Sequence, residues 1–543
     1  MGSADPAAGG PGADGPAVPA RDGTEDTVDV AVVGYGPVGM ALAGLLGRAG
    51  HSVLVLERYP GLYNLPRAAS FDDETMRTLA RLGVAGELLP KLRVQPTYEW
   101  RNARRDLLIE QRFAEVGRSG WAEWYMMYQP DLEDALDRVC RSAPRVDVRH
   151  AHRVVALEQD PSGVRLTVDG PGGRRRLAAR YVVGCDGGNS FVRSALGTGL
   201  HDYGFAEPWM VCDFRFRRPT AVPPALQLGD PAGPTSIISL GPAHHRFSFM
   251  LDSADAFTTE RAPARVWERV GGFLAPGDAE LIRVATYTFR SLVADRWRHG
   301  RVLLAGDSAH QMPPFLGQGM CSGFRDAQNL AFKLDLVLCA AADDQLLDTY
   351  QQEREPHVRA VTERGIELGH LQTLRDPERA AERDRALLAR RAVGAAHEPV
   401  RLPDLAEGMF ARTSGPGRGQ LSTQGVVDDG LRRDLLDQVV GGGFHLLLAP
   451  GLGPEPERLP VLGALTRAGA SVVAPGERSG RAAGVRHVHD VDGTYRRWFA
   501  ELGCSAVAVR PDFYVFGTAR GPEATARLAG ELLGAMTGPV PAG

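Results

Sequence analysis

The chain is predicted to be an α/β protein in which an antiparallel sheet is inserted into a parallel-sheet domain, with a smaller α/β unit following. Three observations support this fold class. Short apolar runs that end in Gly or Asp are each followed by a helical pattern, which is typical of parallel strands. Residues 209–288 instead alternate apolar and polar residues, which indicates an antiparallel sheet with one open face. Beyond residue 426, strand and helix patterns alternate again.

The composition is that of an ordinary globular protein of several domains. The 543 residues include 43% hydrophobic and 24% charged residues, with a net charge of −4. This balance does not favour nucleic acid or an anionic membrane as a partner. No run approaches the roughly 20 apolar residues of a transmembrane helix. Residues 1–27 are rich in Gly, Ala and Pro without an apolar core, so we expect a disordered tail and not a signal peptide.

The six cysteines are scattered and form neither a CxxC nor a Cys/His metal spacing. We therefore expect reduced thiols, no metal site and a cytoplasmic location.

The first motif is a βαβ unit near the N-terminus. Its parts are a strand over 28–33, the turn Gly34-x-Gly36-x-x-Gly39, a helix over 40–49 and a strand over 52–56 that ends at Glu57. In such a unit Gly34 allows a tight turn, Gly36 lets the backbone approach a pyrophosphate, and Gly39 allows the helix to pack closely on the strand. The Glu57 carboxylate stands where it can accept hydrogen bonds from ribose hydroxyls. The motif predicts a dinucleotide site without separating NAD from FAD.

A second strand, over 181–184, leads into Cys185-Asp186-Gly187-Gly188-Asn189-Ser190 and then a helix. A strand hairpin is expected before it, over 153–159 and 164–168. Asp186 could bond a cofactor hydroxyl or a nearby water, or it could cap the helix. The residues of this segment leave both roles open.

The third motif is the stretch 301–334, RVLLAGDSAHQMPPFLGQGMCSGFRDAQNLAFKL. A buried strand over 302–305 ends at Asp307, a loop rich in Pro and Gly follows, and a helix begins near Ser322. Helical periodicity then continues to about residue 369, and a charged, solvated helix is expected over 374–394. Such a loop points backbone N–H groups at a polar ring edge or an anion. Asp326 is expected to be an Arg or cap partner, and His310 a structural histidine.

Together and in this order, these motifs resemble the FAD-dependent aromatic hydroxylases, the single-component (group A) flavoprotein monooxygenases. The resemblance rests on GYGPVG…LER, CDGGNSFVR and GDSAHQMPPFLGQGM…DAQNLAFKL, supported by LPRA at 65–68 and QPDLE at 129–133. It spans residues 28 to about 370. Within the family, PRAASFDDETMR (66–77) and PPFLGQGMCSG (313–323) resemble the 3-(3-hydroxyphenyl)propionate hydroxylase branch.

The resemblance implies FAD as the cofactor, with Asp307 at a ribityl hydroxyl and the N–H groups of residues 319–321 facing the flavin ring. Cys321 stands where many relatives carry Asn, so no side-chain role is transferred to it. The implied cofactor-binding residues are Gly34, Gly36, Pro37, Val38, Gly39, Glu57, Arg58, Arg67, Gln129, Val154, Asp186, Gly306, Asp307, Pro314, Gly317, Gly319, Met320 and Cys321.

The resemblance also implies the domain organisation. It comprises a Rossmann-type FAD-binding domain (28–205 and 291–395), an inserted antiparallel-sheet substrate-binding domain (206–290), a linker (396–425) and a C-terminal thioredoxin-like α/β domain (426–539). Cys504 stands alone in that last domain. We therefore expect packing or contacts within a homo-oligomer there, and not a redox role.

The implied reaction uses NADPH or NADH to reduce FAD and needs no metal. O₂ then gives a C4a-hydroperoxyflavin, and a small phenolic substrate under the antiparallel sheet attacks its distal oxygen. A phenol is a better nucleophile when deprotonated, so a base is expected, with Asp72, His244, His245 and Tyr287 as candidates. Arg246 or Arg290 could hold a substrate carboxylate.

Three alternatives share these motifs. They are a natural-product tailoring hydroxylase, a Baeyer–Villiger monooxygenase acting on a larger polycyclic or polyketide substrate, and a non-catalytic flavoprotein that binds a drug. The last would show no ligand-stimulated oxidation of NAD(P)H. A flavin halogenase is disfavoured because the sequence lacks a WxWxIP segment.

Overall fold

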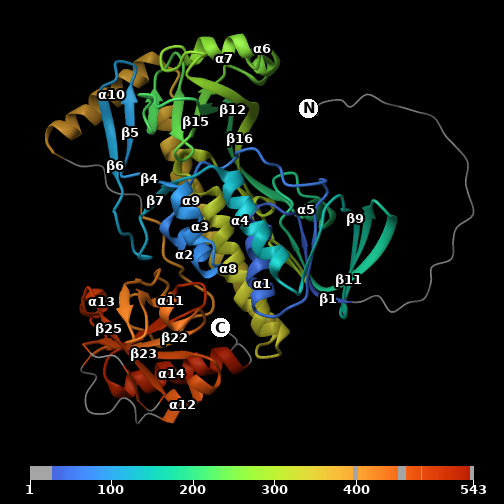
Figure 1. Cartoon of the computed structure of the whole chain (residues 1–543), viewed down its shortest axis with the longest axis vertical. Helices are drawn as coiled ribbons and strands as arrows, with labels where there is room; N and C mark the ends of the chain where they lie inside the picture. Colours follow the sequence, from blue (N-terminus) through green and yellow to red (C-terminus); the bar gives the residue numbers. More distant parts are fainter. Residues whose placement is uncertain (1–26, 395–400, 451–459, 478–479, 483, 539–543) are drawn as a thin grey trace, which may run out of the picture.

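The computed structural model arranges the chain in three bodies (Figure 1). A parallel-sheet domain lies in the middle, the antiparallel sheet lies at one end, and the C-terminal α/β domain packs at the other. The structure describes all residues except 1–26, 395–400, 451–459, 478–479, 483 and 539–543. The tail predicted over 1–27 therefore lies outside the described residues apart from Thr27.

The strands that lead into the three predicted motifs, β1 (Val28–Val33), β11 (Gly173–Gly184) and β18 (Val302–Leu304), lie side by side in the central sheet. In spatial order its strands are β17 (Arg298–His299), β18, β11, β1, β2 (Val53–Leu56) and β8 (Val146–Arg149). β11 also pairs with the hairpin of β9 (Arg153–Asp160) and β10 (Gly163–Gly170). The pairs β18–β11, β11–β1, β1–β2 and β2–β8 are parallel, so the three turns leave the sheet at one edge.

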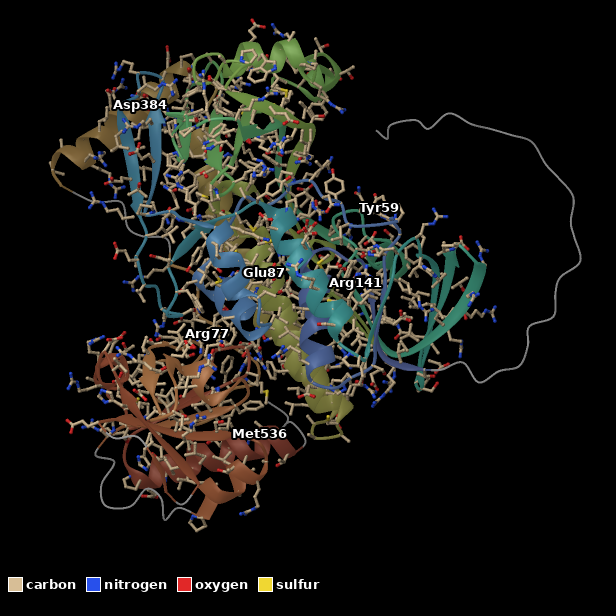
Figure 2. The ribbon with its side chains drawn as sticks, in the orientation of Figure 1. Tyr59, Arg77, Glu87, Arg141, Asp384 and Met536 are labelled. Atoms are coloured by element: carbon tan, nitrogen blue, oxygen red, sulfur yellow. The ribbon has the colours of Figure 1, made fainter. Side chains whose placement is uncertain are left out.

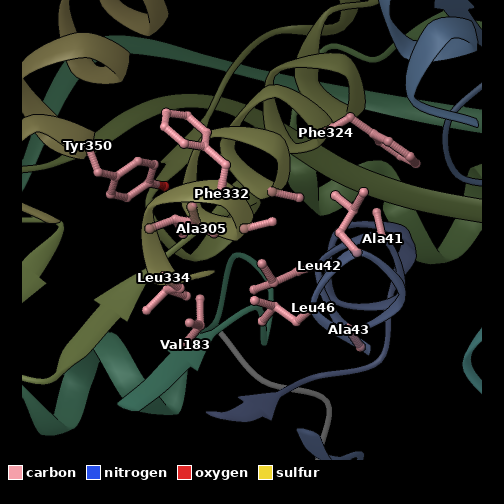
Figure 3. Packing of buried hydrophobic residues seen from close by; sticks show 14 of the residues in the cluster. Ala41, Leu42, Ala43, Leu46, Val183, Ala305, Phe324, Phe332, Leu334 and Tyr350 are labelled. Atoms are coloured by element: carbon pink, nitrogen blue, oxygen red, sulfur yellow. The ribbon is translucent and has the colours of Figure 1, made fainter. Parts of the chain in front are cut away.

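Helices cover this sheet. They are α1 (Pro37–Arg48), α2 (Asp73–Arg81), α3 (Ala85–Leu88), α4 (Gln129–Ser142), α5 (Phe191–Ala195), α8 (Gly319–Leu338) and α9 (Asp348–Gln372). Leu42 and Leu46 of α1 pack toward Val183 of β11 and Leu334 of α8 (Figure 3). Each of these side chains is fully buried, so α1 and α8 share one core with the sheet.

The helix expected near Ser322 begins three residues earlier, at Gly319. Gly319, Met320 and Cys321 form its first turn, where glycine has too low a helix propensity to be recognised. The first helix likewise begins at Pro37 and not at Met40, since Pro is well suited to the first helical position.

The antiparallel sheet is larger than the sequence indicated. Its order is β19 (His310–Gln311), β16 (Ala279–Ala294), β12 (Leu200–Phe216), β15 (His244–Met250), β14 (Thr235–Ser239), β13 (Ala225–Gly229), β5 (Thr97–Asn102) and β6 (Leu107–Arg112). The sequence placed β5 and β6 in the FAD-binding segment 28–205, whereas β5 pairs in parallel with β13. Pairing between segments this far apart leaves no local signal, which explains the difference.

Two short helices, α6 (Phe257–Glu260) and α7 (Pro263–Val270), belong to the antiparallel-sheet body. Val266 and Val270 of α7 pack against Phe214 and Phe247 of the sheet, closing one of its faces. The charged helix α10 (Pro377–Ala392) is largely exposed as expected, but Arg383 is buried and donates to the backbone oxygen of Gly229. A small sheet of β3 (Ser70–Asp72), β7 (Trp124–Met126) and β4 (Arg93–Val94) links the two bodies.

The C-terminal domain is a mixed α/β sheet. Its strands run β21 (Arg433–Leu435), β20 (Val426–Asp428), β25 (Val485–Asp490), β23 (Ser471–Gly476), β22 (His445–Leu448), β26 (Ala506–Val509) and β27 (Val515–Ala519), with β24 (Gly480–Ala482) pairing β25. Its helices are α11 (Leu436–Val440), α12 (Pro460–Arg467), α13 (Thr494–Leu502) and α14 (Pro522–Thr537).

The described part of the predicted linker is packed against the protein. Leu405, Met409 and Ala411 are buried, and the Met409 N–H donates to Glu353 Oε1 of α9 at 2.8 Å. Side chains of the C-terminal domain such as Phe444 join the same hydrophobic core as Phe332 of α8. In the described part of the chain, no helix is long and apolar enough to cross a membrane.

Candidate active site

A cavity of about 530 Å³ lies where the start of α1, the antiparallel sheet and the segment 305–320 meet. Ten of the predicted cofactor residues line it: Gly36, Pro37, Val38, Arg67, Gln129, Asp307, Pro314, Gly317, Gly319 and Met320. Residues from three distant parts of the sequence therefore face one space. Gly34, Gly39, Glu57, Arg58, Val154, Asp186, Gly306 and Cys321 do not line this cavity.

The glycine turn before α1 is shaped by close packing. Gly34 has φ +103°, and a Cβ there would clash with the Cys185 carbonyl. A Cβ on Gly39 would clash with the Gly34 carbonyl, so the helix approaches the strand as closely as only glycine allows. Gly36 faces the cavity just before Pro37, and this directs the N-terminus of α1 at the cavity.

Two of the predicted carboxylates are held by protein N–H groups. Glu57 accepts from the backbone N–H of Tyr35 at 2.8 Å and of Tyr59 at 2.9 Å. Asp186 accepts from the Val192 N–H at 3.0 Å and from the Ser190 hydroxyl at 2.5 Å. Ser190 is the N-cap residue of α5, and Asp186 supports this cap by accepting from the Ser190 hydroxyl and from one N–H of the first turn.

Asp307 and Asp326 have different surroundings. Asp307 opens onto the cavity, and its carboxylate makes no hydrogen bond or ion pair with another described side chain. Because protein encloses it on its other sides, burial raises its pKa. Asp326 is fully buried, and its Oδ2 accepts from the Gly306 N–H at 3.0 Å. His310 Nε2 lies 2.6 Å from the same oxygen. Asp326 and His310 therefore support the turn that presents Asp307.

The loop before α8 makes a tight turn at Gly317, where φ is +64°. A Cβ on Gly317 would lie 2.8 Å from Trp124 Cζ2 and 2.9 Å from Ser70 Oγ. Gly319 and Met320, at the first turn of α8, also line the cavity. The free N–H groups of this first turn therefore lie at the cavity wall.

The Cys321 side chain points away from the cavity. It is fully buried, and its thiol lies 3.7 Å from the Gly317 carbonyl oxygen. Burial raises its pKa to about 12. The Cys321 side chain therefore forms no part of the cavity wall.

Gln129 fixes the turn at Arg67 from within the protein. Its Oε1 accepts from the N–H groups of Arg67 at 3.1 Å and Ala68 at 2.5 Å, and its Nε2 donates to Glu133 Oε1 at 2.6 Å. Arg67 Nη2 also contacts Glu133 Oε1, at 3.0 Å, and its side chain is half exposed. The Arg67 guanidinium thus remains available on the cavity side.

A cofactor-binding role for Arg58 and Val154 stays a prediction, because neither residue lines the cavity. Arg58 is exposed beside Tyr59, and Val154 is buried in β9 within the core.

The structure argues against Asp72 as a catalytic base. Asp72 caps α2 by accepting from the N–H of Thr75 at 2.9 Å, and it is ion-paired with Arg325. Although burial opposes ionisation, Arg325 and these hydrogen bonds hold the pKa of Asp72 below its usual value. It does not line the cavity.

His244 and His245 also lie outside the cavity lining. His244 stacks on Tyr128, with ring centres 3.9 Å apart, and burial lowers its pKa. His245 Nε2 lies 2.9 Å from the Pro223 carbonyl oxygen, and burial lowers its pKa to about 4. Both are structural histidines of the antiparallel sheet.

Tyr287 is the one catalytic candidate of the four that lines the cavity. Burial raises its pKa while the nearby Arg283 opposes that shift, and the net direction is upward. Tyr287 is therefore a neutral hydrogen-bond donor near pH 7, which makes it suited to orient a substrate oxygen and unsuited to act as a base.

The two arginines considered for a substrate carboxylate differ in availability. Arg246 forms a buried ion pair with Asp213 at 2.7 Å and donates to the backbone oxygens of Pro66 and Arg67. Both arginines line the cavity, and Arg290 is exposed. Arg246 thus links the antiparallel sheet to the turn at Arg67. Of these two arginines, Arg290 is the one available to bind a ligand.

A polar patch in the cavity was missed by sequence reasoning. Gln227, Ser236 and Ser248 stand directly opposite one another on β13, β14 and β15, and all three line the cavity. Gln227 Nε2 donates to the Tyr98 hydroxyl, which comes from β5. The polar residues inside the short apolar runs ALQLG and TSIIS were the sequence signal for this patch. The strand pairing that brings the three side chains together could not be predicted from the sequence.

The described residues fit FAD. A helix N-terminus, a glycine turn without Cβ atoms and an unpaired carboxylate at Asp307 suit a pyrophosphate and polyol hydroxyls. The fold and the site thus define an FAD-binding protein of the Rossmann type.

Comparisons with known proteins agree with this class. The family described as "FAD binding domain" matches residues 27–365, and the family described as "HcaD C-terminal domain" matches residues 419–533. A protein of Rhodococcus jostii (strain RHA1), named "Probable NADH-specific resorcinol 4-hydroxylase", is 50% identical over 95% of this chain and 96% of its own length. A "3-(3-hydroxy-phenyl)propionate/3-hydroxycinnamic acid hydroxylase" of Mycobacterium sp. (strain JLS) is 32% identical over 95% and 94%.

Among solved structures, aklavinone-11 hydroxylase in complex with FAD and aklavinone has a TM-score of 0.75 and 26% identity, covering 94% of this chain and 100% of that chain. The OxyS anhydrotetracycline hydroxylase from Streptomyces rimosus has a TM-score of 0.73 and 27% identity, covering 95% and 100%. The chain belongs to the FAD-dependent aromatic hydroxylases, in the branch that resembles 3-(3-hydroxyphenyl)propionate hydroxylase. It is a flavin monooxygenase that depends on NAD(P)H and O₂.

Proposed function

We propose that this enzyme hydroxylates a small dihydroxybenzene of the resorcinol class, with NADH as the reductant. The observation that carries the proposal is the patch of Tyr98, Gln227, Ser236 and Ser248 on the sheet floor of the cavity. A ring with two hydroxyls can satisfy such a patch at one end and face the cofactor with the other. The R. jostii relative, whose name specifies resorcinol and NADH, supports this choice.

The lining favours an uncharged ring over a carboxylate-bearing one. Trp209, Phe289 and Phe315 supply apolar walls, and the Trp209 ring lies against the rings of both phenylalanines. Arg67, Arg246 and Arg290 line the cavity, but Arg246 is already paired with Asp213 and Arg67 with Glu133. Because Arg67 lies at the cofactor turn, a propionate side chain would have Arg290 as its one cationic partner there.

In the working enzyme, FAD supplies the two-electron exchange with NADH and the activation of O₂. Gly36 and the start of α1 would hold its pyrophosphate, Asp307 a ribityl hydroxyl, and residues 319–320 its ring edge through N–H groups. Tyr287 would donate a hydrogen bond to a substrate oxygen and orient the ring. The antiparallel sheet, together with the segments above it, would exclude water from this space.

The test is substrate-stimulated oxidation of NADH by the FAD-loaded enzyme. Resorcinol should stimulate NADH oxidation and yield a trihydroxybenzene, with little H₂O₂ released. The panel should include 3-(3-hydroxyphenyl)propionate, a polycyclic phenol and NADPH in place of NADH. Faster, coupled turnover with the propionate or the polycyclic phenol would overturn the substrate assignment. Absence of stimulation by any phenol would support a binding protein in place of an enzyme.

We also propose that the enzyme acts in the cytoplasm. All six cysteines are unpaired thiols, as expected in a reducing compartment. Cell fractionation of the native producer would test this location.

A further inference from the structure

Three side chains of the C-terminal domain reach deep into the interface with the cofactor domain. Arg510, Asp512 and Tyr514 lie on the turn between β26 and β27, and each is nearly or fully buried. They contact side chains from α2, α8 and α9. Figure 1 shows α8 running from the middle of the molecule toward this domain.

The first set of contacts is a buried cluster of two cations and two anions. Arg510 Nη2 lies 2.7 Å from Glu353 Oε2 and also pairs with Asp512. Lys333 Nζ lies 2.9 Å from the same Glu353 oxygen. Asn329 Nδ2 of α8 donates to Glu353 Oε2 at 2.6 Å and to Asp512 Oδ2 at 2.9 Å. Each domain contributes one cation and one anion, and the Arg510–Glu353 ion pair and the Asn329–Asp512 hydrogen bond join the two pairs across the interface.

This cluster continues toward the Asp307 turn. The residue after Glu353 on α9, Arg354, has its Nε 3.0 Å from Asp326 Oδ1. The other Asp326 oxygen accepts the N–H of Gly306, at 3.0 Å, immediately before Asp307. A shift of α9 would thus be transmitted to the carboxylate that faces the cavity.

A second set of contacts leads to the loop before α8. The Tyr514 hydroxyl lies 3.5 Å from Glu74 Oε2, the oxygen that accepts from Arg325 Nε at 2.6 Å. Arg325 Nη1 in turn donates to Gln318 Oε1 at 2.9 Å. Gln318 stands between Gly317 and Gly319, which both line the cavity. The loop is therefore held from behind through α2 and α8.

We propose that Arg510, Asp512 and Tyr514 are positioning residues through which the C-terminal domain fixes the two turns that hold FAD. Apolar packing alone would stabilise such an interface as well as buried ion pairs do. Ion pairs and hydrogen bonds, however, set the axial position of a helix, because they are directional. The proposal is independent of the identity of the substrate.

The experiment uses two variants of the full chain and one matched control. Tyr514→Phe removes only the hydroxyl near Glu74, and Asp512→Asn removes one charge of the cluster. The control, Asp437→Asn, breaks a buried ion pair across the same interface, between Arg77 Nε and Asp437 Oδ2 at 2.6 Å. Arg77 lies at this boundary in Figure 2. It stands on α2 like Glu74 and its guanidinium lies over the Phe513 ring, but its hydrogen bonds go to Asp437 and Ser422 and not to Glu74, α8 or α9.

Two readouts are needed besides thermal stability. One is the Kd of FAD for the apoprotein, and the other is hydrogen–deuterium exchange of residues 306–320 in the apoprotein. We expect the Kd to rise about fivefold in Tyr514→Phe and about twentyfold in Asp512→Asn, with faster exchange in 306–320. Asp437→Asn should lower the melting temperature while leaving both readouts within about twofold of wild type.

An unchanged Kd and unchanged exchange in Tyr514→Phe and Asp512→Asn would overturn the proposal. So would equal changes in the control, because the interface would then act only through overall stability. If Asp512→Asn does not fold, Tyr514→Phe decides the question alone.

Discussion

The guanidinium carbon of Arg283 lies 5.7 Å from the ring centre of Tyr287 and 6.0 Å from that of Tyr63. Tyr287 lines the cavity, whereas Tyr63 is exposed and does not line it. One buried cation therefore lies near both a cavity tyrosine and a surface tyrosine, and Asp213 Oδ2 lies 3.3 Å from the Nη1 of this arginine.

Tyr287→Phe should raise the KM for the aromatic substrate about fivefold, the loss expected for one hydrogen bond of about 1 kcal/mol. Because burial keeps Tyr287 protonated at neutral pH, the pH profile of kcat/KM between pH 6 and 9 should keep its shape. Steady-state kinetics over this range is the measurement. Tyr63→Phe changes the second tyrosine near Arg283, which does not line the cavity, and as the control it should leave KM unchanged. Loss of a pH limb in Tyr287→Phe would instead identify this residue as the base.

Asp307→Ala should weaken FAD binding about tenfold or more, since a hydrogen bond to a charged group contributes about 1.5–3 kcal/mol. Among the described residues this carboxylate has no hydrogen-bond partner, so the fold should tolerate the change, and the melting temperature should stay close to wild type. Reconstitution of the apoprotein with FAD, followed by flavin fluorescence, measures the affinity. Unchanged affinity would place the polyol elsewhere.

Gly317→Ala should impair both folding and flavin binding. The added Cβ would meet Trp124 and Ser70, and the positive φ adds about 1 kcal/mol of backbone strain. Gly50→Ala is the matched control, because Gly50 also has positive φ (+93°) but nothing lies within 4 Å of its Cβ position. The control should show the strain alone, with normal FAD affinity. Equal FAD affinity in the two variants would contradict close packing at the cofactor loop.

The stability of the protein should fall as the pH drops from about 6.5 to 4. The pKa of His245 is lowered to about 4 in the folded state, whereas the unfolded chain binds a proton near 6.5. Protons therefore favour the unfolded state in this window, and the contribution of His245 amounts to about 3 kcal/mol at its lower end. His245→Gln should reduce the difference in unfolding free energy between pH 7 and 4.5 in urea denaturation. His201→Gln, at an exposed position of the same sheet, should leave that difference unchanged.

The parts of the fold that the sequence predicts are those with local signals. The strand–glycine–helix unit around Gly34–Gly39 and the strand ending before Asp307 both form as expected. The strands at 97–112 were not assigned, because their pairing with β13 joins residues more than a hundred positions apart. Local periodicity carries no information about such a partner.

The site residues likewise fall into those with a local sequence signal and those that depend on long-range folding. Backbone-shaping residues such as Gly36 and Gly317 could be found from the sequence, since glycine in a motif has a geometric meaning. The ion pair of Asp72 could not be predicted, because its partner Arg325 is brought near only by folding. The Gln227–Ser236–Ser248 row was hidden for the same reason.

The pairing of β13 with β5 has a consequence for how new specificities arise in this enzyme. Exchange of 206–290 with the corresponding segment of a relative would transplant Gln227, Ser236 and Ser248 but leave Tyr98 behind on its own strand. The floor of the cavity is therefore not a single exchangeable cassette. A chimera that keeps its recognition intact must exchange two segments, one around 97–112 and one around 206–290.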